Sequence, residues 1–341
     1  MGIMVAHWWQ PGNESQLVQS FPFGFVIFLF FILSGFLITR IVLSFKERNA
    51  AAGTSNWKSI GSFFARRILR IFPVYYVVLL LLHLIEVGHH RELWPWFCTH
   101  TVNIYMSFVN GELGYDRHFW TLSLEEQFYC FWLFALLLVP RKFLKAFITI
   151  GIVGSIFMLY YLWMYTWMYN ARYLLISCFH PFGLGAIIAY YEKYKPESFQ
   201  KLSVRRVKWV LLSLAVFFLA AFALTFNNAF RQLFDMFMGG ILCAIFTCVV
   251  LIAVKNGFRG VFKWLLENRV IRYLGQISYA LYVIHMYLNP LYWEHIAYIV
   301  PFYPQGWQMP VTYFAISVGL ASISWYAMER PINGLKRYFK Y

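Results

Sequence analysis

The sequence predicts an all-α protein, a polytopic membrane helix bundle of about ten helices, on three observations. Hydrophobic residues make up 61% of the 341 residues, whereas charged residues make up only 13%. Apolar runs long enough to cross a bilayer recur along the whole chain. Lysine and arginine are concentrated in alternate connections between these runs. We therefore expect a single transmembrane domain over residues 1–341 and no separate soluble domain.

The first predicted helix is a stub over residues 1–9, which Pro11 and Gly12 end. Only six residues precede His7, and they span about 9 Å of helix against a hydrocarbon core of about 30 Å. We therefore expect this helix to be truncated, or its true start to lie upstream. Full spans are expected near 22–44, 71–88, 119–139, 146–164, 173–191, 208–226, 233–254, 273–298 and 310–328.

The basic residues predict the orientation of these spans. If residue 1 begins on the cytoplasmic side, 25 of the 29 Lys and Arg residues lie on inner segments. The outer segments hold Arg91, Arg117, Arg172 and Arg231. Such a bias is the positive-inside pattern, and it predicts a cytoplasmic C-terminus.

The same distribution explains the net charge of +15, so we expect no nucleic-acid partner. The five cysteines show neither the spacing of metal ligands nor a disulfide framework, so no metal site is expected.

The start of the span at 119–139 carries two adjacent carboxylates, Glu125 and Glu126. A charge at mid-bilayer costs about 2.5–3.5 kcal/mol on insertion scales, which favours a use for at least one of them. At about 100° per residue, Thr121, Glu125 and Tyr129 share a stripe with the preceding His118, and Glu126 points elsewhere. One carboxylate could face a functional site while the other forms a hydrogen bond to a neighbouring helix. Alternatively, both only hold helices together.

Two predicted outer regions are rich in aromatic residues. The first contains Trp94, Trp96, Tyr105 and Trp120, and the second contains Tyr292, Trp293, Tyr303 and Trp307. Aromatic residues at these positions are typical of interfacial belts. Platforms for the apolar faces of sugars are the alternative.

Residues 120–129 read WTLSLEEQFY and closely resemble the W-S-L-S-x-E-E-Q-F-Y signature of the acyltransferase 3 family. Residues 30–39 resemble the second helix of that family, and residues 64–76 resemble the R-x-x-R start of its third helix. Residues 274–285 resemble its late S-Y-x-L-Y-x-x-H helix, and residues 329–331 resemble its closing E-R-P. The motifs occur in family order and cover nearly the whole chain.

The resemblance implies an integral O-acyltransferase of the bacterial inner (plasma) membrane. Such an enzyme would move an acyl group, with acetyl the first expectation, from cytosolic acyl-CoA to a hydroxyl of an extracytoplasmic glycan or glycolipid. Acyl-CoA would be a donor substrate, and no tightly bound cofactor is implied. The alternatives are a glycolipid or anion transporter or flippase without acyl chemistry, and a non-catalytic membrane partner of a synthase.

The expected catalytic residues are His7, Glu125 and Glu126. His7 matches the place of the essential histidine on the family's first helix, and an imidazole can take a proton from an attacking hydroxyl. Glu125 or Glu126 would orient it and balance its charge. The residues alone also allow an interfacial histidine beside the two tryptophans that follow it.

Arg67 and Arg70 are expected to hold the phosphates of acyl-CoA. At i and i+3 they share a helix face, and guanidinium forks suit phosphate oxygens. An ordinary positive-inside cluster would explain the spacing equally well, and the R-x-x-R resemblance favours the donor site. Arg66 matches no motif position and is expected to serve topology alone.

The expected acceptor-binding residues are His118, Trp120, Ser123, Tyr129, Tyr282 and His285. His285 shares a stripe with Ser278 and Tyr282 near the middle of its span, although a packing histidine would show the same pattern.

The depths of these groups predict a narrow channel. Arg67 and Arg70 would lie at the inner surface, and His7 and Glu125 in the outer third, about 15–20 Å away across a core of about 30 Å. An extended pantetheine arm could reach across this gap, so the acyl group would cross the membrane without its donor.

Overall fold

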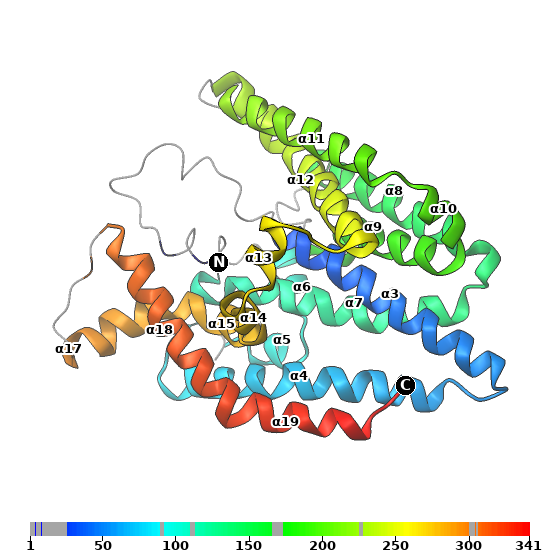
Figure 1. Ribbon diagram of the computed structural model, residues 1–341. Helices are drawn as coiled ribbons and strands as arrows, with labels where there is room; N and C mark the ends of the chain where they lie inside the picture. The colour runs from blue at the N-terminus through cyan, green and yellow to red at the C-terminus, as the bar shows by residue number, and fades with distance from the viewer. Residues whose placement is uncertain are drawn as a thin grey trace. The chain divides into compact units, whose positions relative to one another are not determined.

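The computed structural model describes residues 4, 8, 26–88, 92–109, 113–165, 173–224, 228–299, 304 and 306–341 (Figure 1). Throughout this described part, every regular element is a helix and no strand occurs. The prediction of an all-α helix bundle is therefore confirmed.

The long helices fall where apolar spans are predicted. They are α3 (Ile27–Ala51), α4 (Trp57–Leu84), α7 (Phe119–Leu138), α8 (Arg141–Tyr165), α9 (Leu175–Tyr194), α11 (Val204–Leu224), α12 (Asn228–Asn256) and α18 (Gln308–Ser324). Five stretches among the described residues are long and apolar enough to cross a membrane, judged by length and composition. These are Ile27–Ala51, Trp57–Leu84, Arg141–Leu162, Gly239–Asn256 and Gln308–Tyr338.

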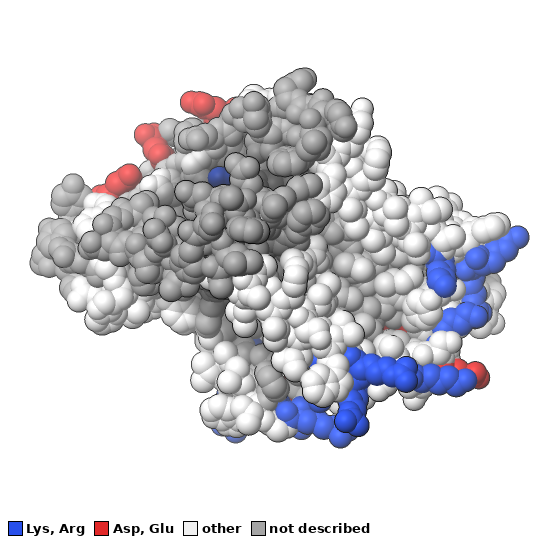
Figure 2. All heavy atoms as spheres, turned by 90° about the horizontal axis from the view of Figure 1, so that it is seen from above, with Lys and Arg blue, Asp and Glu red and all other residues white. Residues whose placement is uncertain are grey.

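Helix α8 exposes a stripe of apolar side chains. Ile150, Val153 and Phe157 follow one another at i, i+3 and i+7 and are 70%, 61% and 61% exposed. A contiguous apolar stripe of this kind is a membrane-facing surface in a protein with this composition. Figure 2 shows Lys and Arg side chains gathered in patches, with most of the remaining described surface in that view uncharged.

Short helices occupy the connections. They are α5 (Trp94–Cys98), α6 (Val102–Val109), η2 (Gly114–His118), α10 (Pro196–Lys201) and α13 (Val261–Glu267).

The predicted span at 273–298 is interrupted. It consists of α14 (Arg269–Gln276), α15 (Ser278–Ile284), η4 (His285–Tyr287), α16 (Leu288–Leu291), η5 (Tyr292–Ile296) and α17 (Ala297–Ile299). Pro290 lies inside α16 and lacks one backbone N–H donor, as do Pro73 in α4 and Pro181 in α9, where the helices continue. The segment contains a 3₁₀ turn in η4 before Pro290 and a π-helical turn in η5 after it.

The chain forms two compact units. The first contains Met1–Glu14, Phe45–Leu124 and Glu267–Tyr341, and the second contains Ser15–Ser44 and Glu125–Leu266. The expected single domain over residues 1–341 stays a prediction.

The core of the first unit gathers around Trp8, which is 2% exposed. Its indole packs among Val74, Leu281 and Leu288 and meets the ring of Tyr313 edge-on at 6.0 Å between centroids. The described residues of the predicted stub are therefore part of a buried core.

The second unit is held by a close crossing of α3 and α9. A Cβ atom on Gly35 would lie 1.9 Å from the carbonyl oxygen of Phe182, and one on Gly185 would lie 1.9 Å from that of Ile32. Only residues without a side chain allow two helices to pack backbone against backbone in this way.

Candidate functional site

The first unit buries a histidine where η2 leads into α7. His118 is 3% exposed, and its Nδ1 atom lies 2.9 Å from the carbonyl oxygen of Tyr115. Its Nε2 atom lies 3.1 Å from the carbonyl oxygen of Val283 on α15. These contacts join two segments that are 165 residues apart in the sequence.

A pair of hydroxyls continues this contact. The Thr121 Oγ1 atom lies 2.7 Å from the Tyr282 hydroxyl, and it donates a hydrogen bond to the carbonyl oxygen of His118 at 3.0 Å. The Tyr282 hydroxyl also reaches that carbonyl oxygen, at 3.2 Å. The structure thus brings together His118 and Tyr282, two of the residues singled out from the sequence.

His285 completes this cluster and is fully buried. Its Nδ1 atom lies 2.6 Å from the carbonyl oxygen of Tyr282, and its ring centroid lies 5.1 Å from that of His118. A carbonyl oxygen only accepts hydrogen bonds, so this contact assigns a proton to Nδ1.

Trp8 of the predicted stub is hydrogen-bonded to the same segment. The Trp8 Nε1–H donates to the carbonyl oxygen of His285 at 2.7 Å. His7, the predicted base, lies outside the described residues.

Asp116 and Tyr287 belong to this neighbourhood, and sequence reasoning missed both. Asp116 is fully buried and accepts a hydrogen bond from the Tyr287 hydroxyl. A Cβ atom on Gly88 would lie 2.7 Å from the Asp116 carboxylate, and Gly88 has φ of +95°. Both facts require glycine there. The available signal was an acidic residue two positions before His118.

In the second unit, Glu125 lies among hydroxyl donors. Ser34 donates to its Oε1 atom at 3.4 Å, and Tyr129, one turn along α7, donates to its Oε2 atom at 3.2 Å. The predicted shared stripe of Glu125 and Tyr129 is therefore confirmed. Below them, Trp132 donates its Nε1–H to Thr39 at 2.7 Å, which joins α7 to α3 again.

The other sequence candidates on α7 differ in exposure. Trp120 and Glu126 are partly exposed, whereas Ser123 is fully buried. The Ser123 hydroxyl has no hydrogen-bond partner among the described residues. No contact in this part of the chain tests their expected roles.

A cluster of basic side chains forms in the first half of α4. Arg66, Arg67 and Arg70 all lie within electrostatic reach of Lys336 in η7 (Leu335–Tyr338). Arg66 is held there by two hydrogen bonds from its Nη1 atom, to the carbonyl oxygens of Lys336 at 2.9 Å and Phe339 at 3.0 Å. Arg66 thus has a structural role, in addition to the charge expected of it. The buried Glu329 carboxylate lies within electrostatic reach of Arg70.

Metal-binding chemistry has no support in the part of the chain that the structure describes, where no group of three His, Cys, Asp or Glu residues has suitable geometry.

Comparison with known proteins gives one family and several bacterial relatives. A family model described as an acyltransferase domain matches residues 1–329. Peptidoglycan O-acetyltransferase OatA of Listeria monocytogenes is 26% identical over 93% of this chain and 53% of its own length. A putative O-acetyltransferase of Staphylococcus aureus strain COL is 26% identical, with 98% and 55% covered.

The putative peptidoglycan O-acetyltransferase YrhL of Bacillus subtilis is also 26% identical, with 91% of this chain and 50% of the relative covered. The chain therefore spans about half the length of these relatives. No solved structure matches it.

Proposed function

Because the chain belongs to the acyltransferase 3 family, whose domain covers residues 1–329, we propose that it is a membrane O-acyltransferase acting on an extracytoplasmic glycan. The family match carries the proposal, and the relatives named as peptidoglycan O-acetyltransferases favour acetyl as the group transferred. Cytosolic acetyl-CoA is the proposed donor. The basic side chains on the predicted inner segments favour a plasma-membrane protein with its C-terminus in the cytoplasm.

In the proposed reaction, His7 acts as general base. It takes the proton of the acceptor hydroxyl as the hydroxyl oxygen attacks the thioester carbonyl. A carbon–oxygen bond forms, the carbon–sulfur bond breaks, and the proton passes from the imidazole to the departing thiolate. Glu125 or Glu126 would balance the charge on the imidazolium.

Two observations support these roles. Trp8, the next residue after His7, is buried and donates a hydrogen bond to the His285 carbonyl oxygen. Glu125 accepts hydrogen bonds from Ser34 and Tyr129, and hydroxyl donors of this kind stabilise a carboxylate away from water.

The acceptor is proposed to contact polar and aromatic side chains near the predicted outer ends of the helices. They are His118, Trp120, Ser123, Tyr129, Tyr282 and His285. His118, Tyr282 and His285 lie together in one buried cluster, which supports the proposed role of these three residues in acceptor binding.

The donor phosphates are proposed to bind in the first half of α4, where Lys336 lies near Arg67 and Arg70. Cations this close together repel one another, and an anion bound among them would reduce that repulsion. The pantetheine arm would then extend from this cluster toward the acceptor.

The test uses the purified full chain in lipid vesicles with labelled acetyl-CoA and a soluble glycan acceptor. We expect release of CoA and labelling of the glycan, both lost in His7→Gln. His83→Gln is the matched control, because His83 lies on α4 and stacks near Trp94 outside the proposed site. Movement of glycolipid across the vesicle membrane without CoA release would favour the transporter instead.

A further inference from the structure

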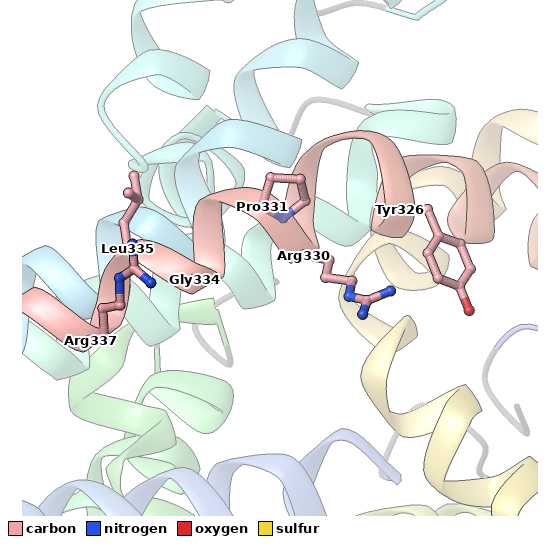
Figure 3. Close-up of a pocket in the computed structure, with 6 residues that line it drawn as sticks. All are labelled: Tyr326, Arg330, Pro331, Gly334, Leu335 and Arg337. Atoms are coloured by element: carbon pink, nitrogen blue, oxygen red, sulfur yellow. The ribbon is translucent and has the colours of Figure 1, made fainter.

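A shallow groove runs along the last helical segment, outside the proposed reaction. It has a volume of about 490 Å³ and is lined by Tyr326, Arg330, Pro331, Gly334, Leu335 and Arg337. Figure 3 shows these residues spaced along η6 (Trp325–Glu329), α19 (Arg330–Gly334) and η7. The spacing of Tyr326, Arg330, Gly334 and Arg337 puts them on one side of the helix.

This segment has two different sides. Glu329 is 4% exposed and lies within reach of Arg70, and Lys336 lies within reach of the α4 arginines. Arg330 and Arg337, in contrast, are exposed. The groove is therefore separate from the basic cluster proposed for the donor.

The two arginines of the groove are available to bind an anion. Within the described ranges neither forms an ion pair with a carboxylate. The Arg330 guanidinium lies over the Tyr326 ring at 5.9 Å, and the Arg337 guanidinium lies over the Tyr338 ring at 4.8 Å. The Arg337 Nη2 atom donates one hydrogen bond to the Tyr338 hydroxyl at 2.8 Å, and a guanidinium has five N–H donors, so others remain from which a phosphate oxygen can accept.

The position of the groove identifies the source of that phosphate. It lies at the end of Gln308–Tyr338, one of the stretches apolar enough to cross a membrane. Along the preceding turns Val311, Leu320 and Ile323 are 57%, 38% and 66% exposed. An exposed tyrosine beside an arginine, directly after an apolar stripe, is typical of a helix end at the membrane–water interface.

We propose that this groove binds the phosphate headgroup of an anionic phospholipid, with the acyl chains lying along the exposed face of α18. Gly334 leaves the floor of the groove open, since nothing lies within 4 Å of the position that its Cβ would take. The site accounts for Arg330 of the closing E-R-P motif, which the proposed acyl transfer does not use.

The test uses the full chain in vesicles of equal parts phosphatidylglycerol and phosphatidylcholine that contain a trace of photoactivatable phosphatidylglycerol. We expect crosslinks to the peptide carrying residues 326–337. Loss of both cations in Arg330→Gln/Arg337→Gln should reduce this crosslinking about tenfold, since each cation near an anionic surface contributes appreciably to lipid attraction.

Two further variants separate the groove from charge in general. Gly334→Phe keeps both arginines and fills the groove, and its backbone has an ordinary helical φ of −60°, so it should fold and also lose the crosslink. Arg205→Gln/Arg206→Gln removes two exposed arginines at the start of α11 and should leave the crosslink unchanged.

The proposal is overturned by any of three results. They are equal crosslinking by photoactivatable phosphatidylcholine, unchanged crosslinking in both groove variants, and displacement of the lipid by excess inorganic phosphate or acetyl-CoA. The last result would assign the groove to a soluble anion.

Discussion

Two hydroxyl side chains, two residues apart on α7, have opposite surroundings. Thr121 bonds to Tyr282 and to the His118 carbonyl, whereas Ser123 is buried with no hydrogen-bond partner among the described residues. A buried hydroxyl without a hydrogen-bond partner costs about 1–3 kcal/mol. Ser123 belongs to the W-T-L-S-L-E-E-Q-F-Y signature and is one of the residues proposed to contact the acceptor.

This contrast gives a prediction about stability. Thr121→Val removes two hydrogen bonds and should destabilise the protein by about 1–3 kcal/mol, and Ser123→Ala should leave stability unchanged or raise it slightly. Thermal unfolding in detergent measures both. A larger loss in Ser123→Ala than in Thr121→Val would contradict the contacts described for α7.

A second prediction concerns the stability of the protein at low pH. Burial against Phe72 and Tyr75 lowers the pKa of His100 from 6.5 to about 4. The unfolded chain therefore takes up this proton first as pH falls. The contribution of His100 to stability is complete above pH 6.5 and declines between pH 6.5 and about pH 4, by up to about 1.4 kcal/mol per pH unit.

The variant His100→Asn tests this prediction, because asparagine tolerates the φ of +53° at this position and does not titrate. We expect the unfolding temperature of the native chain to drop more steeply than that of the variant between pH 6.5 and pH 4. Parallel curves would show that His100 is not the group responsible.

At the scale of helices, the crossing of α3 and α9 is the most restrictive contact. Gly35→Ala would place a methyl group 1.9 Å from a backbone carbonyl that cannot move without separating the helices. We expect little folded protein, whereas Gly154→Ala on α8, where nothing lies within 4 Å, should be neutral or stabilising by about 0.5–1 kcal/mol. Equal yields of the two variants in detergent extracts would show that the crossing is looser than described.

The basic cluster on α4 gives a prediction about binding of the donor. Arg67→Gln/Arg70→Gln should raise the apparent KM for acetyl-CoA about tenfold or more, because each charged hydrogen bond contributes about 1.5–3 kcal/mol. Arg66→Gln should instead release the chain around Phe339, visible as faster amide exchange there, with KM unchanged. An unchanged KM in the double variant would leave these arginines as topology charges.

Most helices were predictable because each needs only a local apolar run, as in α3 and α8. The interruptions at 285–287 and 292–296 were not predicted, although Pro290 is visible in the sequence. Whether a helix bends, breaks or continues past a proline depends on which neighbours satisfy the freed backbone groups.

The candidate site was predictable to a smaller extent. The motif resemblance indicated Tyr282 and His285, the helical stripe indicated His118, and the structure brings the three together. The hydrogen bonds of Asp116 with Tyr287 and of Arg66 with the Lys336 carbonyl join residues 171 and 270 positions apart. No local pattern in the sequence indicates contacts at such separations.

At the scale of the whole molecule, charged residues are only 13% of the chain. The proposed reaction uses a histidine, a carboxylate and a basic cluster that lie on predicted opposite sides of the membrane. In that proposal, this separation would let an acyl group cross while its donor stays in the cytosol.

The most direct measurement is the O-acetyl content of cell-wall glycan, determined by mass spectrometry in host cells without the gene, with the gene, and with its His7→Gln variant. The account predicts acetylated glycan with the native chain and loss of acetylation in the variant at equal protein abundance, with His83→Gln behaving as native. Acetylation that does not change when the gene is removed, or that persists in His7→Gln, would contradict it.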